Sequence, residues 1–378
     1  MRAYLLMMLI AAIVTFFGTF GVLKIAHKYK IYPQIRSRDV HTRPTPRLGG
    51  VAMFAGFLVT AVIAGFLGWF RSVYSDPIHI IAIVAAAFVI TLIGFLDDLY
   101  DLDWSLKLAG QFLVAGILAW QGVQIVSLPI GGLTIGSFGI SFVATVFLTV
   151  LVMNAVNFID GLDGLVAGVV FIGTGVFFTY SYLLAQQTSP TNYFNLASLI
   201  SAIVLGVCLG FLPYNWHRAK IFMGDSGAML LGLLMATSAL TVTGQIDPQI
   251  VSRGELIPAF IPLILPLAIL ILPLLDFSLA VIRRLRAGKS PFAADRAHIH
   301  HRLQDFGHSH LGSVLVFYVW TALISITCLL FFFWPSWAVW LFFNLGLLGS
   351  LTFTLWPLIQ RRLNQKSPNQ PIKVDANV

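Results

Sequence analysis

Four polar side chains follow an apolar run at steps of three residues. The run covers 142–153, and the side chains belong to Asn154, Asn157, Asp160 and Asp163. Steps of three keep side chains on neighbouring parts of one helix face. A helix cap followed by a glycine turn would explain only one of them, and a polar face at the end of an apolar helix is costly unless it meets water, a metal or partner groups. The spacing therefore predicts the centre of an active site.

A second acidic group ends an earlier apolar run. Asp97, Asp98, Asp101 and Asp103 lie close together, and Lys107 follows them. Carboxylates at this spacing repel one another unless a cation intervenes, and Mg²⁺ bound to phosphate oxygens is a common solution. A solvated acidic loop is the alternative. Lys107 is placed to reach a phosphate as a point charge.

Three further segments carry charged or ligating side chains. Arg47 precedes a glycine pair, where an arginine fork could bind phosphate. Asp225 stands in Gly-Asp-Ser-Gly, which suits a metal-binding carboxylate or a plain turn. The third segment holds His298, His300, His301 and Arg302. Zinc would need a further ligand that this segment does not clearly offer, so an anion site is favoured there.

Composition places the chain in a membrane. Of its 378 residues, 58% are hydrophobic and 10% are charged, whereas a soluble domain carries about 25% charged residues. Cys208 and Cys328 lie inside apolar runs and are predicted to be packing residues. The net charge of +8 does not indicate nucleic acid, because the basic residues are confined to short segments between apolar runs.

Eleven apolar runs are long enough to cross a bilayer. They are 4–25, 49–70, 78–96, 107–126, 141–158, 164–184, 195–213, 226–244, 257–282, 312–333 and 337–358. Of the 23 Lys and Arg residues, only Arg2, Arg71 and Arg253 fall on one side of this arrangement. The positive-inside rule therefore puts the N-terminus outside, and the C-terminus and all the polar clusters in the cytoplasm.

The expected fold is an all-α polytopic membrane protein of about eleven transmembrane helices with its active site at the cytoplasmic face. A single catalytic domain would cover 1–360, followed by a disordered cytoplasmic tail over 361–378. Alternating residues around a glycine pair predict a small external hairpin over 127–141.

The four motifs together resemble those of the polyprenyl-phosphate N-acetylhexosamine-1-phosphate transferase family. They are Asp-Asp-x-x-Asp from Asp97, Asn-x-x-Asn-x-x-Asp-Gly-x-Asp-Gly from Asn154, Phe-x-Gly-Asp-Ser-Gly from Phe222 and His-Ile-His-His-Arg-Leu from His298. They occur in this order on alternate loops, and the resemblance covers about residues 1–360. The last motif resembles the UDP-GlcNAc branch (WecA and TagO), whereas the peptidoglycan branch (MraY) has a run of histidines followed by an acid.

The resemblance implies transfer of GlcNAc-1-phosphate from UDP-GlcNAc to an undecaprenyl-type polyprenyl phosphate, with release of UMP. This would be the first membrane step of a cell-envelope glycopolymer, at the bacterial cytoplasmic membrane. It also implies Mg²⁺, for which Mn²⁺ could substitute, with Asp225 and Asn157 as the metal ligands. The implied catalytic acids are Asp97, Asp98, Asp160 and Asp163, and the implied substrate-binding residues are Arg47, Lys107, Asn154, His298, His300, His301 and Arg302.

Chemistry favours one mechanism. A phosphate monoester is largely dianionic at pH 7, so the lipid phosphate needs charge neutralisation and in-line positioning more than it needs a base. Direct attack on the β-phosphorus is therefore favoured over an aspartyl intermediate. The alternatives are phospho-MurNAc-pentapeptide transfer, an intramembrane prenyltransferase, and a cation-coupled transporter, which would place its ionisable residues near the bilayer midplane. A homodimer is compatible with the sequence.

Overall fold

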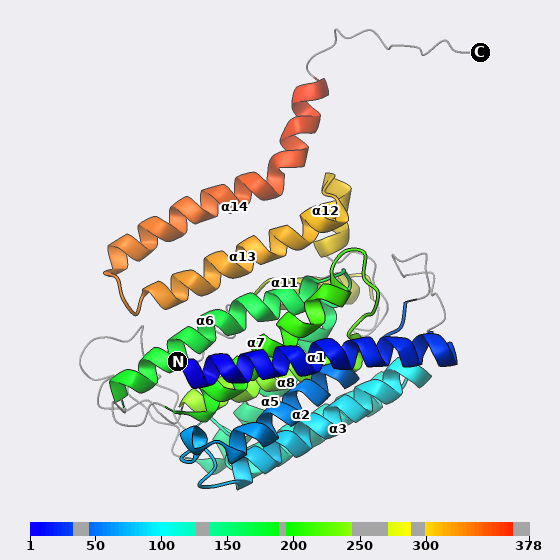
Figure 1. Ribbon diagram of the computed structural model, residues 1–378. Helices are drawn as coiled ribbons and strands as arrows, with labels where there is room; N and C mark the ends of the chain where they lie inside the picture. Colours follow the sequence, from blue (N-terminus) through cyan, green and yellow to red (C-terminus); the bar gives the residue numbers. More distant parts are fainter. Residues whose placement is uncertain (33–44, 126–136, 189–193, 244–270, 289–298, 366–378) are drawn as a thin grey trace.

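The computed structural model describes residues 1–32, 45–125, 137–188, 194–243, 271–288 and 299–365. Within these ranges the chain forms helices and no strand (Figure 1). The helices are α1 (Arg2–Tyr29), α2 (Gly49–Phe66), η1 (Gly68–Phe70), α3 (Ile78–Tyr100), α4 (Trp104–Trp120), α5 (Phe138–Phe158), α6 (Leu165–Thr188), α7 (Leu196–Asn215), α8 (Gly224–Thr243), α11 (Ile271–Arg286), α12 (Ile299–Phe306), α13 (His310–Leu330) and α14 (Ser336–Gln365).

The all-α, multi-pass architecture expected from the sequence is confirmed. In the described part of the chain, nine helices are long and apolar enough to cross a membrane, and α4 is a shorter apolar helix. The predicted run 257–282 lies partly outside the described residues, and α11 covers its end. The direction of the chain across the membrane and the homodimer stay predictions.

Two predicted boundaries shift. The hairpin expected over 127–141 falls mostly outside the described residues, but its last residues, Phe138 to Ser141, are the first turn of α5. Helix α14 continues to Gln365, past the predicted domain end at 360. The remainder of the tail, 366–378, lies outside the described residues. Cys208 is buried and Cys328 half-buried, and both are free thiols, as predicted.

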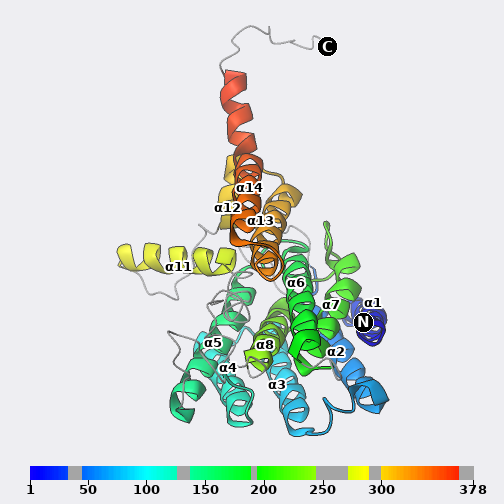
Figure 2. The ribbon, with the colours of Figure 1, turned by 90° about the vertical axis from the view of Figure 1, so that its left-hand side faces the viewer.

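Helix α8 lies at the centre of the bundle (Figure 2). Every residue from Ser226 to Leu240 is buried, and α8 packs against α2, α3, α5 and α7. A helix that is apolar on all sides is expected in such a position. At the crossing with α3, a Cβ on Gly94 would lie 2.4 Å from the Ser226 Cα. Only glycine permits this approach, which brings the end of α3 against the start of α8.

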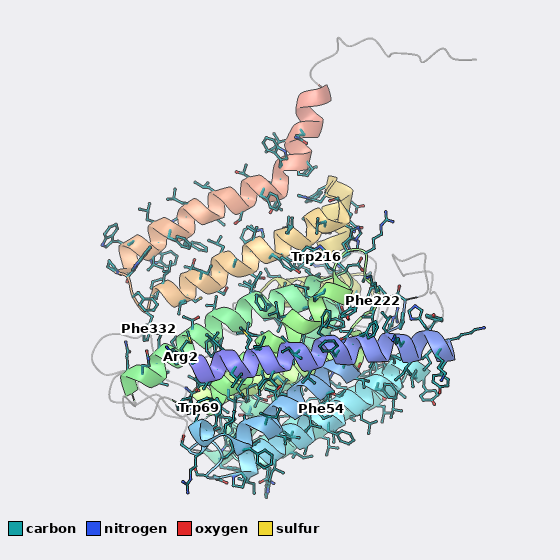
Figure 3. The ribbon with its side chains drawn as sticks, in the orientation of Figure 1. Arg2, Phe54, Trp69, Trp216, Phe222 and Phe332 are labelled. Atoms are coloured by element: carbon teal, nitrogen blue, oxygen red, sulfur yellow. The ribbon has the colours of Figure 1, made fainter. Side chains whose placement is uncertain are left out.

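The outer layer is formed by α13 on α6 and by α14 on α13, while α11 projects from the bundle (Figures 1 and 2). Exposed aromatic side chains mark the two ends of the bundle. Trp69 and Trp216 are both exposed and lie near opposite ends (Figure 3). Tryptophan is enriched at the two membrane–water interfaces, so these residues are consistent with a bundle that spans the bilayer lengthwise.

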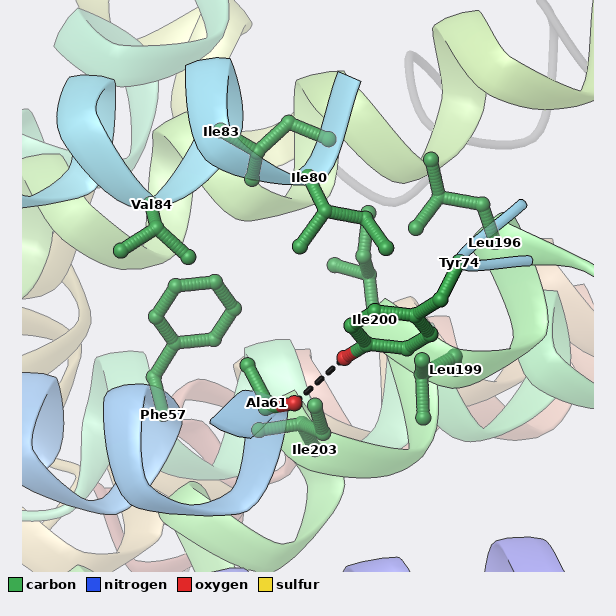
Figure 4. A pocket seen from close by; sticks show the side chains of 10 residues that line it. All are labelled: Phe57, Ala61, Tyr74, Ile80, Ile83, Val84, Leu196, Leu199, Ile200 and Ile203. Atoms are coloured by element: carbon green, nitrogen blue, oxygen red, sulfur yellow. Dashed lines mark hydrogen bonds between the residues drawn. The ribbon is translucent and has the colours of Figure 1, made fainter. Parts of the chain in front are cut away.

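A small apolar pocket lies between α2, α3 and α7 (Figure 4). It is lined by Phe57, Ile83, Ile203 and neighbouring apolar side chains, and Tyr74 closes it by donating its hydroxyl proton to the Ala61 carbonyl. The pocket lies toward the first turns of α3, whereas the acidic residues occupy its last turn. It is therefore separate from the polar site.

Candidate active site

Two carboxylates and one ammonium group form the middle of the site. Asp97 lies in the last turn of α3, Lys107 in the first turn of α4, and Asp225 in the first turn of α8. The Lys107 Nζ donates to the Asp97 Oδ2 at 3.0 Å and to the Asp225 Oδ2 at 3.0 Å. Asp97 is buried, while Lys107 and Asp225 are half-buried. Two acids from distant parts of the sequence therefore face one shared cation, the Lys107 ammonium group.

Asp98 has a different role from its neighbour. Its Oδ1 accepts the Asp225 N–H at 2.9 Å, and its Oδ2 accepts the Ser226 N–H at 3.2 Å and the Ser226 hydroxyl at 2.9 Å. The first N–H groups of a helix have no intrahelical acceptor, and a carboxylate there also favours the helix dipole. Asp98 is thus an N-cap for α8, supplied by another helix, and it fixes the backbone that carries Asp225.

Glycine permits this cap. Gly224 has φ +68°, which is a left-handed conformation, and a Cβ there would lie 2.3 Å from the Asp98 Oδ2. A side chain at position 224 would strain the backbone and also displace the Asp98 carboxylate. The Gly-Asp-Ser-Gly motif is therefore both a turn and the start of a helix whose first amides face an acid.

The other two acids of the Asp97–Asp103 segment form the turn between α3 and α4. Asp101 ends α3 with φ 55°. Asp103 is the N-cap of α4, where its side chain accepts the Ser105 N–H at 2.9 Å. The hydrogen bonds from the Ser105 hydroxyl and from this N–H lower the pKa of the exposed Asp103 carboxyl. Because Asp103 caps a helix, fewer of the four acids in this segment are available to bind a cation than the sequence suggests.

Arg47 reaches the site through a short backbone pairing. The Phe222 N–H donates to the Pro46 carbonyl at 2.9 Å, and the Gly49 N–H donates to the Phe222 carbonyl at 3.0 Å. This pairing holds Arg47 beside Gly224, whose Cβ would lie 2.5 Å from the Arg47 carbonyl oxygen. An arginine from the first polar segment therefore lies where α8 begins, as its proposed role in phosphate binding requires.

The last turn of α5 supplies Asn157, and the turn after α5 supplies Asp160. Asn157 hydrogen bonds to the Asp225 carboxylate. Asp160 lies outside the helices that could span the membrane. Burial raises the pKa of Asp160 to about 7, and the Asp225 and Asp163 carboxylates add to this shift, whereas the Arg47 guanidinium opposes it. A carboxyl with a pKa shifted to near neutrality is a common feature of functional sites.

Asn154 pairs with another amide. Its Nδ2 donates to the Gln111 Oε1 at 2.6 Å and to the Val150 carbonyl at 2.8 Å. Gln111 lies one turn after Lys107 in α4, so the amide pair connects α4 to α5 just behind the lysine. The structure therefore places Asn154 where it supports Lys107, and its predicted direct contact with substrate stays untested.

Asp163 contacts two histidines and a backbone amide. Its Oδ2 lies 3.1 Å from the His217 Nδ1, and it accepts the Ala219 N–H at 3.2 Å. The Asp163 N–H donates to the His310 Nε2 at 3.1 Å. Asp163 thus holds the α5–α6 turn to the α7–α8 loop and to the start of α13.

The His/Arg motif is only partly described. His298 lies outside the described residues, and His300, His301 and Arg302 belong to α12, which packs on α13 and α14. Arg302 is exposed. The placement of this motif against a donor phosphate stays a prediction.

The residues around Asp225 fit a hard cation. The Asp97 Oδ1 is buried and accepts no hydrogen bond from the residues that the structure describes. Carboxylate and amide oxygens at Asp97, Asp225 and Asn157 are the donors that Mg²⁺ prefers. Lys107, which lies between the two carboxylates, occupies the place of a cation shared by both.

Several residues that build the site were not assigned roles from the sequence. Ser226 was visible inside the Gly-Asp-Ser-Gly motif, whereas Asn215, which accepts the Gly164 N–H, lies outside every motif. The roles of both depend on partners far away in the chain. Gln111 had only its spacing from Lys107 as a signal. His310 had none, because it lies beyond the His/Arg motif and acts on Asp163, 147 residues away.

The fold and site define a multi-pass membrane protein with a compact acid–lysine cluster at one end of its helices. Residues 80–243, which include this cluster, match the family model of glycosyl transferase family 4. The chain is 38% identical to the decaprenyl-phosphate N-acetylglucosaminephosphotransferase of Mycobacterium leprae, over 96% of this chain and 92% of that protein.

Two more distant relatives are similar over most of the chain. The probable undecaprenyl-phosphate N-acetylglucosaminyl 1-phosphate transferase of Bacillus subtilis is 36% identical over 82% of this chain and 79% of that protein. The undecaprenyl-phosphate alpha-N-acetylglucosaminyl 1-phosphate transferase of Escherichia coli is 29% identical over 92% of both. The chain therefore belongs to the polyprenyl-phosphate N-acetylhexosamine-1-phosphate transferases of glycosyl transferase family 4, which confirms the family expected from its motifs.

Proposed function

We propose that this protein transfers GlcNAc-1-phosphate from UDP-GlcNAc to a polyprenyl phosphate at the cytoplasmic face of the bacterial cytoplasmic membrane. The products are polyprenyl diphosphoryl-GlcNAc and UMP. The observation that carries the proposal is the contact of Lys107 with both Asp97 and Asp225 at the end of an apolar bundle. Such a site brings cationic and metal-binding groups to the depth at which a lipid phosphate meets a soluble nucleotide sugar. The names of the bacterial relatives support the donor sugar and the lipid acceptor.

Each group near α8 has a role in bringing two anions together. Asp225 and Asn157 would hold Mg²⁺, with Mn²⁺ as a substitute, and the ion would neutralise charge on the diphosphate. A divalent cation shared by Asp97 and Asp225 would leave Lys107 available for a phosphate oxygen. Arg47 adds a second positive charge, whose guanidinium acts on the buried Asp160 carboxyl.

The reaction is a direct displacement. An oxygen of the dianionic lipid phosphate attacks the β-phosphorus, the bond from that phosphorus to the bridging oxygen breaks, and UMP leaves with the electron pair. The nucleophile needs no base, because it is already ionised at pH 7. Asp98 is a poor nucleophile here, since both of its oxygens accept hydrogen bonds from the start of α8. Asp97 and Asp225 hold Lys107 at the site before the cation binds.

The test is transfer of label to lipid. The purified full-length protein in detergent, supplied with UDP-[¹⁴C]GlcNAc and undecaprenyl phosphate, should give a butanol-extractable product and an equal amount of UMP. A chelator should stop the reaction, and Mg²⁺ should restore it. UDP-MurNAc-pentapeptide, offered in parallel, should give much less product.

Controls separate this function from its alternatives. Asp225→Asn should be inactive, whereas Asp76→Asn, which changes an exposed acid at the far end of the bundle, should match the wild type. Equal use of both nucleotide sugars would move the protein to the peptidoglycan branch. UMP release in the absence of any lipid phosphate, in a burst equal to the enzyme concentration, would refute direct attack. No lipid-linked label with any donor would refute the proposed function as a whole.

A further inference from the structure

A carboxylate and two imidazoles lie together beside the acidic cluster. Asp163 comes from the α5–α6 turn, His217 from the α7–α8 loop and His310 from the start of α13. The His217 Nδ1 lies 3.1 Å, and the His310 Nε2 3.8 Å, from the Asp163 Oδ2. In the described part of the chain, this is the one group of three such residues whose ligand atoms all lie within 4.8 Å of one another. Ligands of a tetrahedral zinc ion stand about 3.3 Å apart, so small side-chain movements would complete a site.

The three side chains are held by a rigid frame. The Asn215 Oδ1 accepts the Gly164 N–H at 3.0 Å, and the Tyr318 hydroxyl donates to the Gly164 carbonyl at 2.5 Å. The Ala219 N–H fixes the orientation of the Asp163 carboxylate. Hydrogen bonds of this kind orient metal ligands and raise metal affinity. The cluster is therefore positioned before any ion binds.

The protonation of the imidazoles also suits a metal. A backbone N–H can only donate, so the His310 Nε2 that accepts the Asp163 N–H carries a lone pair. This is the form in which histidine binds metals. The His217 Nδ1 lies at hydrogen-bond distance, 3.1 Å, from the Asp163 Oδ2, and a cation would take the place of the proton between them. It would also replace the contact between the His310 Nε2 and the Asp163 N–H.

The exposure of His217 to solvent leaves room for a fourth ligand of the metal ion. The Asp163 side chain is 3% exposed and that of His310 is 16% exposed, whereas His217 is 38% exposed. The two imidazole rings stack with centroids 4.9 Å apart. An ion could enter past His217 and keep a water molecule as its fourth ligand, as in zinc sites with three protein ligands.

We propose that Asp163, His217 and His310 form a binding site for Zn²⁺ that is distinct from the proposed Mg²⁺ site. Two imidazoles and one carboxylate select a first-row transition metal, whereas the oxygen donors at Asp97, Asp225 and Asn157 select Mg²⁺. Bound zinc would fasten the α5–α6 turn, the α7–α8 loop and the start of α13 to one another. The proposal does not depend on the transferase function.

Direct metal binding tests the proposal. Untagged full-length protein in detergent, stripped with a chelator and returned to Mg²⁺ buffer, should bind one Zn²⁺ per chain, measured by elemental mass spectrometry. Cobalt should give the visible absorption of a four-coordinate ion. His217→Ala and His310→Ala should each weaken zinc about 10- to 100-fold in competition with a zinc-binding dye. His308→Ala is the matched control, because His308 instead lies 2.8 Å from the Thr354 carbonyl oxygen, and it should bind zinc as the wild type does.

Two further measurements keep the test independent of folding. His310→Ala also removes an acceptor for the Asp163 N–H, so the thermal unfolding of each variant is measured in zinc-free buffer. A second variant, His217→Gln, keeps a polar group at an exposed position. Weaker zinc binding in folded His217→Gln supports the site. Folded wild type without stoichiometric zinc, unchanged binding in both His217 variants, or loss of binding only in His301→Ala would each overturn it.

Discussion

Replacing Asp98 separates its structural role from a catalytic one. In Asp98→Asn, the remaining oxygen can keep the hydrogen bond from the Asp225 N–H, which is 2.9 Å long in the wild type. The new amide nitrogen then faces the Ser226 N–H, which is also a donor. A hydrogen bond to a charged group contributes about 1.5–3 kcal/mol, and an unsatisfied buried donor costs about 1–3 kcal/mol. We expect a loss of about 3 kcal/mol in the free energy of unfolding for Asp98→Asn.

Asp98→Ala should cost more, about 5 kcal/mol, because it leaves the Asp225 and Ser226 N–H groups without their acceptor, while the Ser226 hydroxyl keeps only the Met223 carbonyl. Ser226→Ala, which removes only the hydroxyl, should cost about 1 kcal/mol. The assay is unfolding in detergent for the single and double variants. Because Asp98 and Ser226 are in direct contact, the two losses should not be additive.

Activity decides between the two roles. If Asp98 acts by positioning Asp225, the Asp98→Asn variant should need more Mg²⁺ for half-maximal rate and regain part of its turnover at high Mg²⁺. Asp103→Asn, at an exposed cap of α4, is the control and should change neither stability nor the Mg²⁺ requirement appreciably. Wild-type stability with turnover lost by orders of magnitude at every Mg²⁺ concentration would refute the cap and identify Asp98 as a reacting group.

Three further changes test the rest of the site. Asp225→Asn should lower turnover by orders of magnitude, because a lost metal contact removes several kcal/mol of transition-state stabilisation; full activity at ordinary Mg²⁺ would exclude this residue from the metal site. Lys107→Gln should tighten Mg²⁺ binding, since it removes the cation that competes for Asp97 and Asp225, yet raise the KM for lipid phosphate; unchanged values of both would contradict the assignment. For Asp160, the folded pKa of about 7 lies above the unfolded value of about 3.9, so the folded state holds the proton more tightly. Its contribution to stability is present below pH 4 and is lost as pH rises to 7. Metal-free Asp160→Asn should therefore melt higher relative to wild type at pH 8 than at pH 5, and an equal difference at both values would count against this shift.

The long apolar runs of the sequence were sufficient to predict the helices. Runs of this length and composition have few options other than a helix, because every backbone polar group in a bilayer must be satisfied within its own segment. The exceptions have local causes. The first turn of α5 lies where alternating residues suggested a hairpin, and α14 continues to Gln365 because a change to polar composition does not by itself end a helix.

The site was predicted as a set of residues but not as a set of roles. The spacing of acids in the Asp97–Asp103 segment looks uniform, yet Asp97 faces Lys107, Asp98 caps α8, and Asp103 caps α4. In the same way, Asn154 pairs with Gln111, and Asp163 lies with two histidines instead of with Lys107. Spacing along one helix shows which side chains share a face, but it does not show which groups meet them from other helices.

The sequence alone determined the membrane class, the helices, the family and the segments that carry charge, because hydrophobicity, helical period and motif spacing are local properties of the chain. The tertiary structure decided which acids hold the cation and which hold the backbone. That division depends on the contact of α3 with α8 at Gly94, which directs one carboxylate of an adjacent pair to Lys107 and the other to the first amides of α8. Neighbours in sequence point in different directions on a helix, so only the packing of distant helices could assign their chemistry.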